Sequence, residues 1–286
     1  MTSIDVVAPP QHVLERARAA VEPLLGAALA ELPDETREVV ERGLVRQDFS
    51  TAALVLLSAE AFGDAEVTKT AVALEFAHLH ERLHADLMAR GPLREAFGAD
   101  RVVSAADALL SLACARLTRS GVMILNVALM SVVDGYVQEI GMEERDDVDM
   151  SEHLGVAAAK HSALTAAACE LGALAAGASA SQARHLREFG DDVGLARKHV
   201  DDVLAPQDGH RTLPVVAAAC AGITVDGARK WCEQQADLLL ARALNHLRQC
   251  GPRARAASEL SALAEEITIA RCRPVVPPQA VAAPSL

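Results

Sequence analysis

Apolar residues recur every three or four positions along most of the chain, which is the spacing of one buried face on an α-helix. Prolines and glycines, such as Pro33 and the Gly91-Pro92 pair, separate the periodic segments. The segment 104–117 is apolar nearly all round, as expected of a central buried helix. The pattern predicts helices at 11–31, 34–45, 50–63, 66–89, 104–117, 120–142, 153–177, 180–204, one that starts within 211–222, 226–250 and 253–271.

These segments predict an all-α protein in which about ten to twelve helices form a single large bundle. Hydrophobic residues make up 51% of the 286 residues and aromatics only 2%, a composition that favours packed helices over sheets. No linker divides the chain, so we expect one domain over 11–272, after a leader at 1–10 that closes with Pro9-Pro10. The tail at 273–286 holds four prolines and no charge after Arg273, and it is expected to be disordered.

The net charge of −12 argues against a nucleic-acid partner. A protein that binds a phosphate backbone normally carries a basic face, so nucleic acid is not expected as a partner. The chain shows no signal peptide pattern and no run of about 18 uninterrupted apolar residues, so we expect no membrane insertion. Its six cysteines form no C-x-x-C pair and are expected to be reduced core residues of a cytoplasmic protein.

The stretch HERLHADLMARG at 80–91 permits a zinc interpretation. His80 and His84 are four residues apart on one helix face, as two zinc ligands must be, and Glu81 would be the general base. A zinc protease also needs a third ligand and a sheet edge to hold the peptide, and the sequence identifies neither. The alternative is a pair of helix histidines without a metal.

The same stretch also resembles a different motif when more of the chain is included. ALEFAHLHERLHADLM at 73–88 resembles the first aspartate-rich helix of the trans-prenyl diphosphate synthases, the polyprenyl synthetase family, whose pattern is roughly E-x-x-H-x-x-x-x-x-H-D-D-x-x-D. The matching residues are Glu75, His78, His84 and Asp86. The first and last aspartates of the triplet are replaced by Ala85 and Ala89.

Further resemblances follow in the family's order. SAADALLSLA matches its A-G-D-A-L-L helix at Asp107, VVDGYVQEI contains Gly135, and AAAKHSALTAAACELGALAAGA keeps Lys160. FGDDVGLARKHVDDVL at 189–204 resembles F-G-x-x-x-G-x-A-F-Q-x-x-D-D-x-L-D, and HRTLPVVAAA resembles the K-K-T-L-P-V start of the next helix. Each motif is weak alone, but six in order identify the family and imply the isoprenoid synthase fold, a helix bundle around a central cavity.

The resemblance implies chemistry on an allylic prenyl diphosphate. In the family, magnesium ions held by two aspartate-rich segments neutralise the pyrophosphate that leaves when the carbocation forms. Lys and Arg side chains hold the diphosphates. Carried over to this chain, the expected metal ligands are Asp201, Asp202 and Asp86. The expected diphosphate-binding residues are Lys160, Arg211, Arg90 and Lys198.

The departures from the family pattern affect this chemistry directly. Asp86 is turned about 100° around the helix from the position that carries Ala85. Lys198 replaces a neutral glutamine and could pair with Asp201 or Asp202 as an internal substitute for a metal ion. Magnesium is therefore expected at the second motif only, and magnesium-dependent prenyl transfer is expected to be impaired.

Two functions stay open at this point. The first is a non-catalytic or regulatory partner subunit of a prenyl diphosphate synthase, in a homodimer or in a heterodimer with a catalytic synthase. The second is a diverged active prenyltransferase or terpene cyclase that acts on an allylic prenyl diphosphate. Substrate chain length does not follow from the sequence.

Overall fold

The computed structural model describes residues 8–45, 47–143, 145, 147–205 and 212–272. Every regular element within these ranges is helical, as the sequence pattern predicts. The leader at 1–10 lies mostly outside the described residues, and the tail at 273–286 lies wholly outside them. The helices are α1 (Pro10–Leu29), α2 (Asp34–Leu44), α3 (Ser50–Glu60), α4 (Thr68–Met88), α5 (Pro92–Phe97), α6 (Ala99–Cys114), α7 (Arg119–Glu143), α8 (Met150–His161), α9 (Ala163–Ala175), α10 (Ala180–Leu204), α11 (Leu213–Ala221), α12 (Val225–Gln249), α13 (Ala254–Ile267) and the 3-10 turn η1 (Ile269–Cys272).

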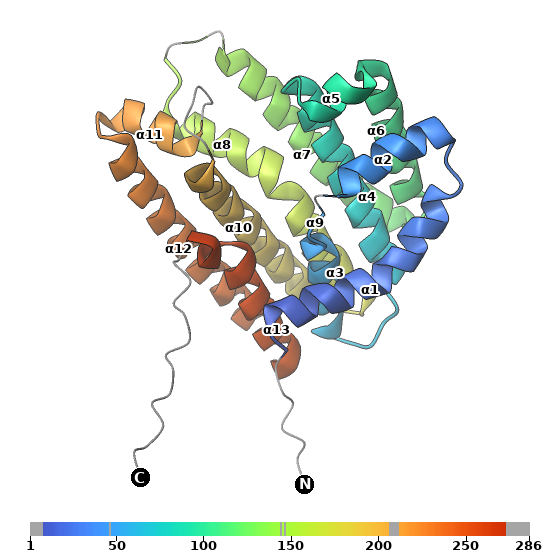
Figure 1. The fold of residues 1–286 in the computed structure, drawn as a ribbon. Helices are drawn as coiled ribbons and strands as arrows, with labels where there is room; N and C mark the ends of the chain where they lie inside the picture. The colour runs from blue at the N-terminus through green and yellow to red at the C-terminus, as the bar shows by residue number, and fades with distance from the viewer. Residues whose placement is uncertain (1–7, 46, 144, 146, 206–211, 273–286) are drawn as a thin grey trace, which may run out of the picture.

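The helices form a bundle in which α3, α9 and α10 lie at the centre. Figure 1 shows α1, α2 and α4–α6 on one side of this centre and α11–α13 on the other. Helix α10 packs most extensively against α12 and α9, while α4 packs against α6 and α3. The two segments that resemble the aspartate-rich motifs therefore lie on different helices of one bundle, α4 and α10.

The described residues form thirteen α-helices, more than the predicted ten to twelve, because one predicted segment is divided and the short helix α5 was not predicted. The segment 153–177 breaks at Ser162, where the hydroxyl donates to the Ala158 carbonyl at 2.7 Å and also contacts Asp191. A hydroxyl bonded back to the preceding turn is a known cause of helix bending. The segment 104–117 starts earlier than predicted, at residue 99, and a short helix at 92–97 precedes it.

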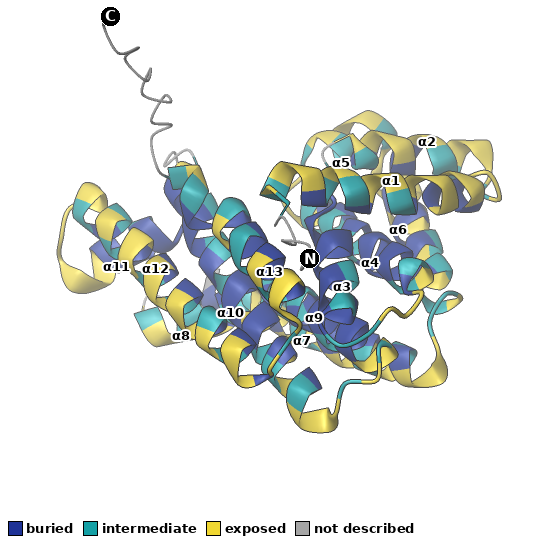
Figure 2. Ribbon diagram, turned by 90° about the horizontal axis from the view of Figure 1, so that it is seen from below, coloured by how far each residue is buried: buried dark blue, intermediate teal, exposed yellow. Residues whose placement is uncertain are grey.

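Two glycines set how closely α10 approaches α8 and α9. A Cβ on Gly190 would lie 2.6 Å from the Thr165 carbonyl oxygen, and one on Gly194 would lie 2.7 Å from the Cα of Ser162. Only glycine fits at these two positions without moving backbone. This close packing seats α10 against α8 and α9, and Figure 2 shows the buried residues concentrated where these central helices meet.

Helix α7 carries the largest run of exposed apolar side chains. They recur at spacings of three and four, so they form one stripe: Met123, Val127, Met130, Val133, Val137 and Ile140. By length and composition alone, the span 119–142 is long and apolar enough to cross a membrane. The sequence analysis did not predict this, because it searched for runs of uninterrupted apolar residues. The other face of α7 packs against α8 and α9.

Candidate functional site

A cavity of about 300 Å³ opens between α3, α4, α8 and α10, and this volume is at the lower end for small-molecule sites. It lies between the two segments that resemble the family's aspartate-rich motifs. Among the described residues that line it, the carboxylates are Glu81 and Asp201, and the cations are Arg82, Arg197 and Lys198. The rest of its polar lining consists of two histidines and three hydroxyl residues: His78, His161, Ser50, Thr51 and Thr165.

The α4 wall presents an alanine where the family pattern has an aspartate. Ala85 lines the cavity, whereas Asp86 turns toward α5. The Asp86 carboxylate accepts the backbone N–H of Arg94 at 2.8 Å and that of Leu93 at 3.2 Å. These donors belong to the first turn of α5 and have no partner inside that helix. The structure therefore places Asp86 as a helix cap, away from the other expected metal ligands.

On the α10 wall, Arg197 connects α10 to the start of α3 at the cavity mouth. Its guanidinium donates to the Ser50 hydroxyl at 2.9 Å and to the Asp48 carboxylate at 2.8 Å. Burial acts to raise the pKa of Asp48, but Arg197 and the hydrogen bonds from Ser50 outweigh it and lower that pKa to about 2. Asp48 therefore stays ionised and holds Arg197 at the mouth.

Lys198 makes the ion pair that the sequence suggested. Its ammonium donates to Asp202 at 2.7 Å, one helical turn away. The other Asp202 oxygen accepts the backbone N–H of Leu213 at 2.9 Å, at the start of α11. Only 8% of the Asp202 side chain is exposed, so this pair is shielded from water. A lysine ammonium thus occupies one oxygen of Asp202, which the family resemblance gave as an expected metal ligand.

Asp201 is also engaged by cations, although it faces the cavity. Arg271 of η1 forms a hydrogen-bonded ion pair with one of its oxygens, and the Arg197 Nε lies 3.8 Å from the other. The donor set therefore does not fit a magnesium cluster gripped from both walls. One wall offers alanine, and basic side chains already neutralise the carboxylates of the other.

The two cavity histidines are neutral near pH 7. Burial, reinforced by Arg197, lowers the pKa of His78 to about 4. Burial also lowers the pKa of His161 well below its ordinary value, with Lys198 and Lys160 acting in the same direction. The fixed positive charge of the cavity therefore comes from the arginines and the lysine.

Glu81 and Lys160 contact the same tyrosine. The Tyr136 hydroxyl donates to Glu81 at 2.8 Å, and burial raises the pKa of the Glu81 carboxyl. The Lys160 ammonium lies 4.2 Å from the Tyr136 ring centre and donates to Glu139 at 2.6 Å. The structure thus places Lys160 behind Tyr136 and outside the residues that line the cavity.

The remaining expected residues do not join the cavity. Arg90 is exposed just beyond the end of α4, in the left-handed region with φ of 52°, and it does not line the cavity. Arg211 lies outside the described residues. His80 and His84 stack edge to face with ring centres 4.6 Å apart, and His80 pairs with the Ala106 carbonyl at 2.9 Å. Within the described ranges no third ligand group joins these two histidines, which leaves the zinc interpretation without support.

The sequence argument missed two cations of the cavity. Arg197 stands at the phenylalanine of the family pattern, directly before Lys198, so the alignment already contained this signal. Arg82 lies inside the H-E-x-x-H stretch, and its guanidinium donates to Gln47 at 2.9 Å. Nothing local indicated that Arg82 would face the cavity, because its orientation depends on how α4 packs against α2 and α3.

Comparisons with known proteins agree on the family. The polyprenyl synthetase family model matches residues 51–213. A geranylgeranyl diphosphate synthase from Methanosarcina mazei is 30% identical over 242 residues, which cover 73% of this chain and 74% of that protein. A crystal structure of a polyprenyl synthetase from Streptomyces coelicolor A3(2) is 27% identical, with a TM-score of 0.79 over 90% of this chain and 99% of that chain.

The fold is shared more widely than the sequence. A geranylgeranyl pyrophosphate synthetase from the archaeon Geoglobus acetivorans superimposes with a TM-score of 0.83 at 21% identity, over 90% of this chain and 98% of that chain. The all-helical bundle, the motif order and the family match lead to one conclusion: this chain belongs to the polyprenyl synthetase family and has the isoprenoid synthase fold.

Proposed function

We propose that this chain is a non-catalytic or regulatory partner subunit of a prenyl diphosphate synthase. The observation that carries the proposal is the replacement of the metal-binding donor set. Alanine lines the α4 wall at position 85, and on the α10 wall Lys198 and Arg271 neutralise Asp202 and Asp201.

The energetic argument rests on the leaving group. Pyrophosphate leaves an allylic carbon only when its developing charge is neutralised, and carboxylate-bound magnesium ions do this in the family. The family pattern has aspartates where this chain has Ala85, Ala89 and, at the end of the second motif, Ala205. If each of these three missing ligands removed about 3 kcal/mol of transition-state stabilisation, the rate would fall by about 10⁶-fold or more. Such effects are not additive, so the figure gives only the scale. It is large enough to make ordinary magnesium-dependent elongation ineffective.

The cavity retains features that suit an anionic ligand without a metal. Arg82, Arg197 and Lys198 exceed the lining carboxylates in number, and burial raises the pKa of one of these carboxylates, Glu81. Guanidinium and ammonium groups bind phosphate oxygens directly. We infer that a prenyl diphosphate can be held here without being ionised, with magnesium, if present, confined to Asp201 and Asp202.

A partner subunit also needs a docking surface. The exposed apolar stripe of α7 offers one, beside a groove of about 570 Å³ whose lining residues come mainly from α7, α8 and α9. We infer that the chain dimerises through this face, with a second copy or with a catalytic synthase of the same family.

The test measures product formation by the isolated chain and by the chain with an intact family member from the same organism. Each sample receives geranyl, farnesyl or geranylgeranyl diphosphate with isopentenyl diphosphate and magnesium. We expect no product from the isolated chain, and a changed product length or rate when it is added to the partner. Elongation or cyclisation by the isolated chain at a rate normal for its relatives would support the diverged enzyme instead.

A gain-of-function variant provides the matched control. The triple variant Ala85→Asp, Ala89→Asp, Lys198→Gln restores the family residues and removes the internal cation. We expect it to bind a diphosphate at least about 10-fold more tightly with magnesium than with EDTA, whereas the wild type shows no such dependence. Equal magnesium dependence in the two proteins would mean that these substitutions did not disable the site.

A further inference from the structure

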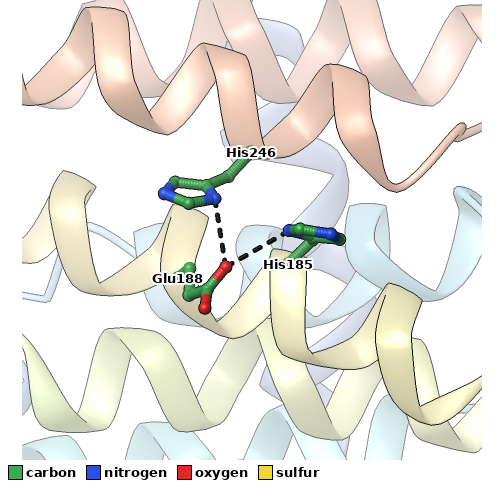
Figure 3. A group of neighbouring side chains, drawn as sticks. All are labelled: His185, Glu188 and His246. Carbon is green, nitrogen blue, oxygen red and sulfur yellow. Dashed lines mark hydrogen bonds and ion pairs between the residues drawn. The ribbon is translucent and has the colours of Figure 1, made fainter.

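Outside the cavity, two histidines and a glutamate from two helices meet around one oxygen atom. His185 and Glu188 lie one turn apart on α10, and His246 reaches them from α12 (Figure 3). The Glu188 Oε2 is 3.2 Å from the His185 Nδ1 and 3.1 Å from the His246 Nδ1. One ligand atom from each of the three residues lies within 4.8 Å of the others, the only such group among the described residues.

These separations suit tetrahedral coordination. Zinc binds imidazole nitrogen at about 2.0–2.1 Å and carboxylate oxygen at about 2.0–2.2 Å, so neighbouring ligand atoms of a tetrahedral site are about 3.4 Å apart. The two nitrogen–oxygen distances are within a few tenths of an ångström of this value. The ligand atoms of the two histidines also lie within 4.8 Å of one another, a separation that side-chain rotation can adjust to a single ion.

The hydrogen bonding of His246 provides an independent indication. Its Nδ1 is buried, yet it forms no hydrogen bond to the described residues, although Glu188 Oε2 lies 3.1 Å away. A buried polar nitrogen normally has a partner. On the other side of the ring, the buried Asp192 carboxylate lies 3.9 Å from Nε2 and is held by Arg242 at 2.8 and 2.9 Å. A carboxylate there favours a proton on Nε2, which leaves the Nδ1 lone pair free for a metal.

We propose that His185, Glu188 and His246 bind one zinc-like divalent ion that links α10 to α12. Two imidazoles and one carboxylate are the donors that zinc accepts and that magnesium does not prefer. The fourth position would be taken by water, since 41% of the Glu188 side chain is exposed. The site is separate from the diphosphate cavity and does not depend on the function proposed above. Its expected effect is to stabilise the packing of α12 against the helix that carries Asp201 and Asp202.

The experiment titrates the full-length, EDTA-treated protein with zinc chloride and measures heat release, bound zinc per chain and melting temperature. We expect one zinc per chain and a higher melting temperature with zinc. Glu188→Gln and His246→Asn should each weaken zinc binding by at least about 10-fold and remove the zinc-dependent rise. Helical circular dichroism checks that each variant is folded, and Glu188→Gln is a mild change at a half-exposed side chain.

Two controls separate this site from other zinc ligands in the chain. The His80→Ala, His84→Ala double variant removes the histidine pair on α4 and should bind zinc as the wild type does. Cobalt in place of zinc should give the visible absorption of a nitrogen- and oxygen-ligated site, without the thiolate charge-transfer bands that cysteine ligands would add. No stoichiometric zinc in the wild type, or unchanged binding in both Glu188→Gln and His246→Asn, would overturn the proposal.

Discussion

At the scale of single residues, three carboxylates at the cavity are paired with basic side chains of the same chain. Asp202 is held by Lys198 and by the N–H of Leu213, so it needs no metal ion to be stable in its buried position. In the same way, Asp48 is held by Arg197, whose guanidinium donates to its carboxylate. Each of these pairs removes a carboxylate from competition for magnesium and, at the same time, fixes a cation beside the cavity.

The same residue scale predicts an acid sensitivity to which His199 contributes, as do the buried histidines of the cavity, His78 and His161. The His199 side chain is 1% exposed, and burial lowers its pKa to about 4, although the nearby Asp202 acts to raise it. An unfolded histidine has a pKa near 6.5, so as the pH falls from about 6.5 toward 4 the unfolded chain takes up a proton that the folded chain does not. Folding stability is therefore lost in that window, by about 2 kcal/mol at pH 5 from this one group.

His199→Leu should remove this contribution. Urea unfolding at pH 5, 6 and 7.5 should show a fall in unfolding free energy that is smaller by about 2 kcal/mol in the variant than in the wild type. The Nδ1 of His199 is buried and makes no hydrogen bond to the described residues, so the variant loses no polar contact there. His12→Leu at an exposed position is the matched control and should keep the wild-type slope. Identical slopes in all three proteins would contradict the assignment to His199.

Residue-level sequence reasoning recovered part of this site. The ion pair of Lys198 followed from a cation placed one turn from Asp202, a local relation that the helix period fixes. The contacts of Arg197 with Asp48 and Ser50 join residues about 150 positions apart. No periodicity links such residues, so only the packed structure could show them. For the same reason the sequence could not indicate that Asp86 caps α5.

At the scale of elements, the helix pattern was predictable where it depends on local periodicity and on breakers. Gly91-Pro92 separates α4 from α5, and the motif helices α4 and α10 were both expected over nearly their full lengths. The break at Ser162 was missed because an alanine-rich segment is a good helix former on every local measure. Its cause includes a contact with Asp191 on another helix, which is a tertiary effect.

Asp86 gives the prediction that belongs to this scale. Asp86→Ala leaves the Leu93 and Arg94 N–H groups of α5 without their acceptor, and loss of such a cap costs about 1–2 kcal/mol. Chemical denaturation should show this loss, and Asp86→Asn, which keeps one acceptor oxygen, should lose less. Magnesium affinity should not change in either variant. A variant with full stability and weaker magnesium binding would instead place Asp86 in the metal site.

At the scale of the whole molecule, the two faces of α7 determine how the chain meets other molecules. One face packs within the bundle, and the other exposes an apolar stripe over most of the helix length. An apolar surface of this extent is typical of an interaction site. Length and composition alone would also permit α7 to contact lipid. An experiment must therefore distinguish whether a second protein chain or lipid covers the stripe.

We expect a dimer in which the α7 stripes of two chains cover one another, and the Val127→Glu, Val137→Glu variant should dissociate it. Burying a carboxylate without a partner in an apolar interface costs several kcal/mol. The variant would bury two such carboxylates from each chain, so the interface should not form. Light scattering after size exclusion should give a dimer for the wild type and a monomer for the variant. Val103→Glu, on an exposed part of α6, should stay dimeric. A monomeric wild-type chain that floats with liposomes would show that lipid, rather than a second chain, covers α7.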